Sequence, residues 1–215
     1  MDDVHVVEIA VTGPKGAPND RVVEIAVCRV LSDGSDFDTL YSDSIALDPL
    51  DLGKGPLDYL ESNYGITAQD LYAGSPEGRV VEDFQKILFG AECTSYNVGN
   101  VFGKHLNFEP WDATRNLTLL PSVSVRLPAE LRGPPEHLLI RRAYMSLCPG
   151  DPAGVGDGRH AIDLAQMSAS VTALLRREGL FRARTWRRGL SERACPVEPE
   201  DHPVHYDECQ TSQVS

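Results

Sequence analysis

The chain has 215 residues, of which 24% are charged and 41% hydrophobic, and its formal net charge is −12. This length suits one α/β domain with a tail, and the mixture of apolar and charged residues excludes an intrinsically disordered chain. The negative charge argues against a protein that coats nucleic acid through charge alone. The five cysteines are scattered, and the sequence has no signal-peptide pattern or membrane-length apolar run. We therefore expect a cytoplasmic protein with reduced thiols and no membrane partner.

The hexapeptide VVEIAV occurs twice near the start, at residues 6–11 and 22–27. β-Branched residues dominate both copies, and turn-forming Gly, Pro, Asn and Asp residues separate them, so each copy is predicted to be a strand. A third strand is predicted at 39–47. Short links favour antiparallel neighbours, so the three strands should form a meander. Two adjacent central strands with similar burial need similar residues, and this accounts for the repeated hexapeptide.

The remainder of the chain predicts helices with short strands between them. Thr67, with Asp70 three residues later, marks the start of a short helix. The other predicted elements are a helix at 75–90 that ends at Gly90, a strand within 91–98, a two-turn helix before Pro110, a candidate strand at 117–125, and helices at 135–147 and 159–180. Residues 195–215 are polar and contain prolines, which indicates a loosely held tail.

In this order the elements resemble the ribonuclease-H-like fold of the DEDDh 3′–5′ exonucleases, the family of the proofreading epsilon subunit of DNA polymerase III. The matching segments are VVEIAVTG (D-x-E-x-T-G in the family), NYGITAQDL (HGIT), SYNVGNVFGKHL (HN-x-x-x-D-x-x-x-L) and GRHAIDLA (H-x-A-x-x-D-A). The resemblance implies an α/β fold whose mixed central sheet contains the antiparallel three-strand meander and is flanked by helices. It places this domain at residues 1–181 and leaves an arginine-rich extension and tail at 182–215.

The resemblance also implies a catalytic site with bound metal ions. Enzymes of the family hold two divalent ions, Mg²⁺ or Mn²⁺, with four carboxylates and use a histidine as general base. Glu8 and Ala10 fall at the two acid positions of the first strand, so Glu8 keeps a carboxylate and Ala10 offers no ligand. Val101 falls at the third acid position, with Asn100 beside it, and we expect Asn100 to cap the helix that it begins. Candidate nucleic-acid contacts are Thr12, Asn97 and Asn100.

The last segment places His160 at the general-base position. Alignment on the alanine that follows the fourth acid puts Leu164 at the metal position and leaves Asp163 one residue early, turned by about 100° on a helix. Helical periodicity places Leu164 on the apolar stripe and Asp163 off it. The candidate catalytic residues are therefore His160 and Glu8, and the candidate metal ligands are Glu8 and Asp163.

Two further clusters lie near the C-terminus. Cys195, His202, His205 and Cys209 have zinc-binding side chains, but their spacing does not match a common structural site. Seven arginines lie between Arg176 and Arg193. A solvated helix end is the simpler interpretation of these arginines, and contact with phosphate or an acidic partner is the alternative.

Three hypotheses follow. The first is an exonuclease-like protein with impaired catalysis and no required metal, which binds the 3′ end of single-stranded DNA or RNA or serves in protein assembly. The second is a working Mg²⁺- or Mn²⁺-dependent 3′–5′ exonuclease with a rearranged site made of Glu8, His160, Asp163 and Asn100. The third is a structural protein partner or homodimer that touches no nucleic acid.

Overall fold

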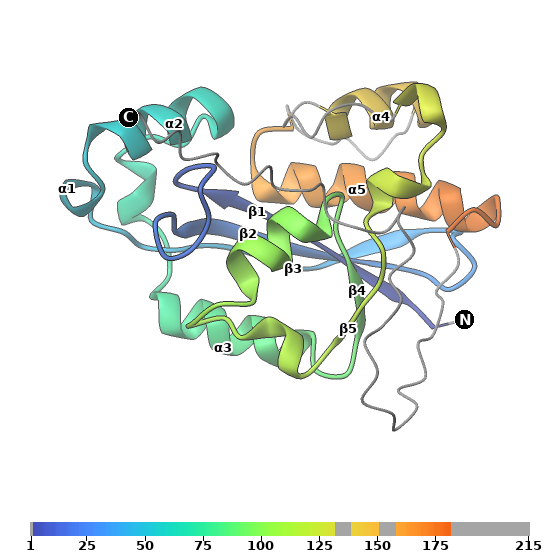
Figure 1. Ribbon diagram of the computed structural model, residues 1–215, viewed down its shortest axis with the longest axis horizontal. Coiled ribbons are helices and arrows are strands. Elements are labelled where there is room, and N and C mark those ends of the chain that lie inside the picture. Colours follow the sequence, from blue (N-terminus) through green and yellow to red (C-terminus); the bar gives the residue numbers. More distant parts are fainter. Residues whose placement is uncertain (1, 132–138, 151–157, 182–215) are drawn as a thin grey trace, which may run out of the picture.

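The computed structural model describes residues 2–131, 139–150 and 158–181, whose strands form one five-stranded sheet in the order β3-β2-β1-β4-β5 (Figure 1). The antiparallel meander consists of β1 (Val4–Val11), β2 (Val22–Val30) and β3 (Phe37–Ser44). On the other side of β1, β4 (Glu92–Thr94) and β5 (Thr118–Leu119) continue the sheet in parallel. The predicted mixed sheet and the predicted meander are confirmed.

β1 lies at the centre of this sheet and is buried on both faces. Side chains alternate between the two faces of a strand, so Val7, Ile9 and Val11 point to one face while Val6, Glu8 and Ala10 point to the other. Apart from Glu8, these side chains are apolar and buried. A strand that is covered on both faces needs such a nearly continuous apolar run, which explains the first copy of the repeat.

α5 (Ala161–Arg177) covers the face of the sheet that carries Glu8 (Figure 1). Four alanines spaced four residues apart form its contact stripe: Ala161, Ala165, Ala169 and Ala173. Residues at this spacing lie on one side of a helix, and their short side chains let the helix lie close to the sheet. α4 (Leu139–Leu147) packs on the side of α5 that faces away from the sheet (Figure 1).

The opposite face of the sheet is covered by α3 (Glu77–Ile87), and α2 (Lys54–Tyr64) and the π-helix η2 (Gly99–Leu106) contribute to the same apolar cluster. Phe84 of α3 and Phe102 of η2 are fully buried in this layer, against the odd-numbered side chains of β1. The helix predicted at 75–90 is confirmed as α3, and the two-turn helix before Pro110 is present as η2 in π rather than α geometry.

Several local predictions need correction. α1 (Pro49–Leu52) and α2 were not predicted, because glycines and prolines interrupt residues 49–56 and α2 buries only Leu60 and Tyr64. The expected strand at 117–125 is reduced to β5, since the chain turns at Pro121 into the 3-10 helix η4 (Val123–Arg126). The remaining 3-10 turns are η1 (Asp70–Tyr72), η3 (Ala113–Arg115) and η5 (Ala129–Leu131).

The capping pair predicted before η1 is present, because the Asp70 carboxylate accepts hydrogen bonds from both the backbone N–H and the hydroxyl of Thr67. In the described segments, Cys28 and Cys93 are free thiols. None of the helices in these segments combines the length and the apolar character needed to cross a bilayer. The predicted tail at 195–215 and the zinc-binding cluster within it lie outside the described residues.

Candidate functional site

Glu8 is a buried carboxyl group in the middle of β1, with only 7% of its surface exposed. Its Oε1 accepts a hydrogen bond of 2.6 Å from the backbone N–H of Tyr96, which follows β4, and one of 2.7 Å from the hydroxyl of Ser168 on α5. Burial raises the pKa of Glu8 from 4.5 to about 7, although both hydrogen bonds act in the opposite direction. Glu8 therefore joins β1, the end of β4 and α5, and near pH 7 its carboxyl is divided between neutral and ionised forms.

Ala10, two residues further along the same face, is fully buried and lies directly opposite Glu24 of β2. A methyl group offers no donor to a cation, so this position adds apolar surface beside Glu8. In the second copy of the repeat, Glu24 occupies the place that Glu8 has in the first. The two glutamates thus project from neighbouring strands toward the same helix, α5.

Glu24 holds the start of α5. Its Oε2 accepts a 2.9 Å hydrogen bond from the backbone N–H of Ala161, and its Oε1 lies 2.9 Å from Nδ1 of His160. The carboxylate satisfies a first-turn N–H group of the helix and places negative charge at its N-terminus, where the helix dipole favours an anion. His160 thus lies at the N-cap of α5, half-exposed and oriented by Glu24.

The segment from Tyr96 to Val101 contains three of the predicted site residues. Val101 is buried and apolar at the third acid position. The predicted cap at Asn100 is wrong, because Asn97 performs this role: its Oδ1 accepts a 3.1 Å hydrogen bond from the backbone N–H of Asn100. Asn97 and Asn100 are both half-buried, so their side chains remain partly accessible at this end of η2.

Asp163 was predicted to lie off the buried side of α5, and this is wrong. It is only 9% exposed, and its carboxylate accepts a 3.1 Å hydrogen bond from the backbone N–H of Gly158. The reason is that the turn before α5 folds back over this side of the helix and places Gly158 on Asp163. Leu164 is half-buried and packs against the same apolar cluster as Ala10, as the stripe predicted.

Thr12, the remaining predicted contact, closes the β1–β2 hairpin. Its backbone N–H donates to the carbonyl of Arg21, and its hydroxyl accepts a 2.9 Å hydrogen bond from the N–H of Arg21. The side chain is buried. Thr12 therefore fixes the start of the loop at residues 13–20, which extends beyond the end of β1.

The donor set does not fit the pair of divalent cations that the resemblance implies. Hard cations such as Mg²⁺ and Mn²⁺ need several anionic oxygens, whereas Glu8 has Ala10, Val101 and Leu164 at the other three expected ligand positions. Its Oε1 is already engaged by two donors, and Asp163 and His160 have partners elsewhere. Across residues 2–131, 139–150 and 158–181, no three His, Cys, Asp or Glu side chains gather as a metal site requires.

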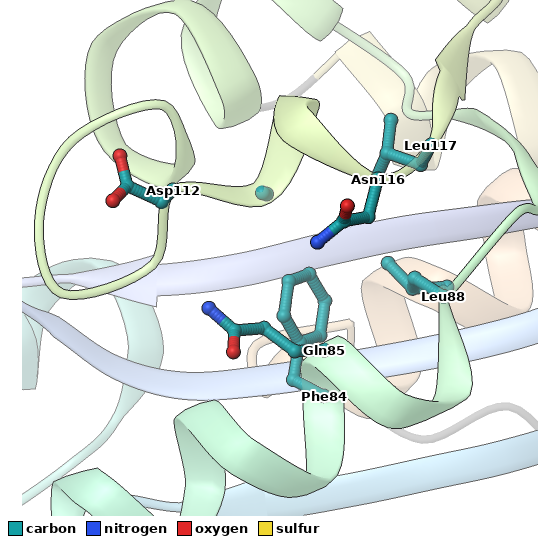
Figure 2. A pocket seen from close by; sticks show the side chains of 7 residues that line it. Phe84, Gln85, Leu88, Asp112, Asn116 and Leu117 are labelled. Atoms are coloured by element: carbon teal, nitrogen blue, oxygen red, sulfur yellow. The ribbon is translucent and has the colours of Figure 1, made fainter.

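A small cavity lies between α3 and the segment at 112–117, away from Glu8. Figure 2 shows Phe84, Gln85 and Leu88 of the α3 side facing Asn116 and Leu117 of the opposite segment. Its volume is about 10 Å³, which is about the space of one water molecule. Gln85 also donates a 2.8 Å hydrogen bond to the carbonyl of Trp111. This cavity is a packing feature and offers no room for a ligand.

The comparisons with known proteins concern the fold. No protein-family model and no curated protein matches the sequence. Among solved structures, the chain is similar to a 3′-exonuclease described in 3′-end-specific recognition of histone mRNA stem-loop (TM-score 0.58, 12% identity), covering 83% of this chain and 65% of that one.

Two further structures are similar. The nuclease domain of 3′hExo, a DEDDh family member, bound to rAMP, aligns with a TM-score of 0.54 at 13% identity over 83% of this chain and 94% of that domain. E. coli exonuclease I in complex with a dA16 oligonucleotide aligns with a TM-score of 0.52 at 14% identity over 84% of this chain and 42% of that one. The fold expected from the sequence segments is confirmed: the chain has the ribonuclease-H-like α/β fold of the DEDDh 3′-exonucleases.

Proposed function

We propose that this protein is a nucleic-acid-binding module built on the exonuclease fold, in which the two-metal hydrolysis typical of that fold is impaired. The observation that carries the proposal is the set of side chains around Glu8. One buried carboxyl, whose burial favours its neutral form, stands where the resemblance implies four carboxylates. The neighbouring positions contribute methyl and aliphatic groups, which cannot offset the charge of two dications.

Nucleic-acid binding is supported by the fold and by what the similar structures bind. One of them recognises an RNA stem-loop at its 3′ end, and another holds a deoxyadenylate oligonucleotide. In the present chain, Asn97, Asn100 and the half-exposed His160 remain partly accessible. A polynucleotide can be held through its phosphates and bases without the cations that activate water.

One observation favours a working hydrolase as the second candidate. His160 is oriented by Glu24 through a 2.9 Å contact, and a histidine held by a carboxylate is a common arrangement for a general base. Glu8, Asp163 and His160 would then need ligands from outside the described residues, or a different geometry, to form the rearranged site.

A cleavage assay separates the two candidates. Purified protein is incubated with 5′-labelled single-stranded DNA or RNA in Mg²⁺ or Mn²⁺, beside Glu8→Gln and His160→Ala variants prepared in the same way. We expect no 3′ shortening by any of the three proteins. Shortening by all three proteins would indicate a contaminating nuclease, because the activity of a contaminant is unaffected by either substitution. Shortening that is lost in both variants would refute impaired catalysis.

A binding titration tests the remaining part of the proposal. Affinity for a labelled single strand should fall steeply as salt rises, because phosphate contacts release counterions. Absence of binding at every salt concentration would contradict nucleic-acid binding and leave a role in protein assembly.

A further inference from the structure

A wide groove lies outside the Glu8 site, between the β1–β2 loop and the outer side of η2. Its volume is about 720 Å³, within the range of roughly 300–1,000 Å³ found for pockets that take drug-sized molecules. The loop supplies Lys15 and Asn19 to one wall, and η2 with the residues after it supplies Gly99, Gly103, Lys104 and Phe108 to the other. We call this the Lys15–Lys104 groove.

The two walls of the groove are joined by hydrogen bonds. The backbone N–H of Ala17 donates to the carbonyl of Lys104 at 2.9 Å, and Nζ of Lys104 donates to the carbonyl of Pro14 at 3.1 Å. Gly16, at φ 89°, passes so close to Lys104 that an added Cβ would lie 3.0 Å from its Cβ and carbonyl oxygen. The loop is therefore anchored on η2, and the groove is formed before any ligand arrives.

The charge of the groove differs from that of the protein as a whole. The sequence contains four lysines and carries a net charge of −12, yet two of the four lysines line this groove. Lys15 is exposed. The nearby acid Asp20 turns its carboxylate toward the loop backbone, where Oδ2 accepts a 2.7 Å hydrogen bond from the N–H of Gly16. The charged residues that line the groove are thus both lysines, in a protein whose net charge is negative.

An aromatic ring completes the groove. The side chain of Phe108 is 45% exposed, although phenylalanine is among the residues most often buried in folded proteins. It follows η2, four residues after Lys104. Aromatic rings on which bases stack, together with cations that meet the phosphates, are what single-stranded nucleic-acid sites use. The two glycines on the same wall leave space for a flat base beside the helix.

We infer that the Lys15–Lys104 groove binds a single-stranded polynucleotide, with a base stacked on Phe108 and phosphates placed near Lys15 and Lys104. This inference rests on the proposed nucleic-acid-binding function and specifies where the strand lies. The position is suited to it, because the loop starts directly after Thr12, the residue that follows β1, and η2 carries Val101. A strand in the groove would therefore run along elements that lead to Glu8.

The test is a fluorescence-anisotropy titration of the full-length protein with short oligothymidylate and oligouridylate, which separate DNA from RNA. EDTA is present so that metal-dependent cleavage cannot interfere. The groove variants are Lys15→Ala and Phe108→Ala. Their matched controls are Lys54→Ala, an exposed lysine on α2, and Phe89→Ala, a more exposed phenylalanine after α3. The thermal midpoint of every variant is measured to confirm that it is folded.

Phe108→Ala should weaken binding by at least about fivefold, the lower limit for the loss of one stacked base. Lys15→Ala should reduce the slope of log affinity against log salt by about 0.7, the value for one phosphate contact on a single strand. Both control variants should bind like the unmodified protein. If the unmodified protein binds and all four variants match it, the groove assignment is wrong while the proposed function stands. If the unmodified protein does not bind either oligonucleotide, both fail.

Discussion

Glu8 is the residue whose ionisation should be visible in the stability of the whole protein. Its pKa is raised from 4.5 to about 7 by burial. The folded protein therefore favours the neutral form of the Glu8 carboxyl. The stabilisation of the folded state by this preference is fully present below pH 4.5 and is lost as pH rises through 7. The full effect is on the order of 3 kcal/mol of unfolding free energy.

We predict that, as pH rises from 5 to 8, the unmodified protein loses unfolding free energy relative to the Glu8→Gln variant. Urea unfolding of both proteins at each pH measures this difference. Glutamine keeps an acceptor for Tyr96 and Ser168 but cannot ionise. The comparison must be a difference, because burial lowers the pKa of His105 to about 4 and this residue acts in the opposite sense in both proteins. If this difference in unfolding free energy does not change with pH, burial does not raise the pKa of Glu8 as inferred.

At the scale of one element, the start of α5 depends on a residue from a distant strand. Glu24 of β2 accepts a hydrogen bond from Ala161 and contacts His160, which lies at the N-cap and provides no side-chain cap of its own. A lost helix cap and an unpaired N–H each cost about 1–2 kcal/mol. The second glutamate of the repeat thus stabilises a helix, whereas the first is the buried acid of the site.

We predict that Glu24→Ala lowers the free energy of unfolding by about 1–2 kcal/mol, and that Glu24→Gln loses less because its amide oxygen still accepts from Ala161. Chemical denaturation of both variants at one pH measures this. Equal losses in the two variants would mean that the charge on Glu24, rather than the hydrogen bond to the helix, stabilises α5.

The local elements could be predicted from the sequence because their causes are local. The apolar runs of β1 and β2, the Thr67–Asp70 pair and the periodicity of α3 each lie within a few residues. α2 was missed because its pattern is weak and its start contains glycine and proline. The burial of Asp163 was missed because the turn at Gly158 covers it, and the residue pattern of a single helix contains no information on a second neighbour.

The same limit applies to the candidate site. The sequence could identify Glu8 and His160 by position. It could not identify Tyr96, Ser168 and Glu24 as their partners, since these pairs are 88, 160 and 136 residues apart. A charged residue in the middle of an apolar strand was nevertheless a usable signal, because a buried carboxylate must find donors somewhere in the fold.

At the scale of the whole molecule, the end of α5 determines where the domain can be shortened. Leu175 and Phe181 are buried in a core cluster with Val4 of β1. The guanidinium of Arg176 donates 2.8 Å hydrogen bonds to the carbonyls of Asp2 and Ser32. Arg176 is therefore a buried structural residue, and the expected solvated helix end is wrong for it.

We predict that a chain ending at Phe181 unfolds with the same midpoint as the full-length protein. A chain ending at Leu174 should lose several kcal/mol, because burying one large apolar side chain contributes about 1.5–3 kcal/mol. Urea unfolding of the three proteins tests the boundary. Equal destabilisation of both shortened chains would place the end of the domain beyond residue 181.

The central position of β1 has a consequence for biosynthesis. β1 leaves the ribosome well before the strand that pairs with its second edge, Glu92–Thr94, and before the helix that covers its Glu8 face, Ala161–Arg177. At ordinary translation rates this interval lasts several seconds. During that time β1 is an apolar strand with an open edge that other chains could pair with, so we expect slower translation to lower the yield of folded protein.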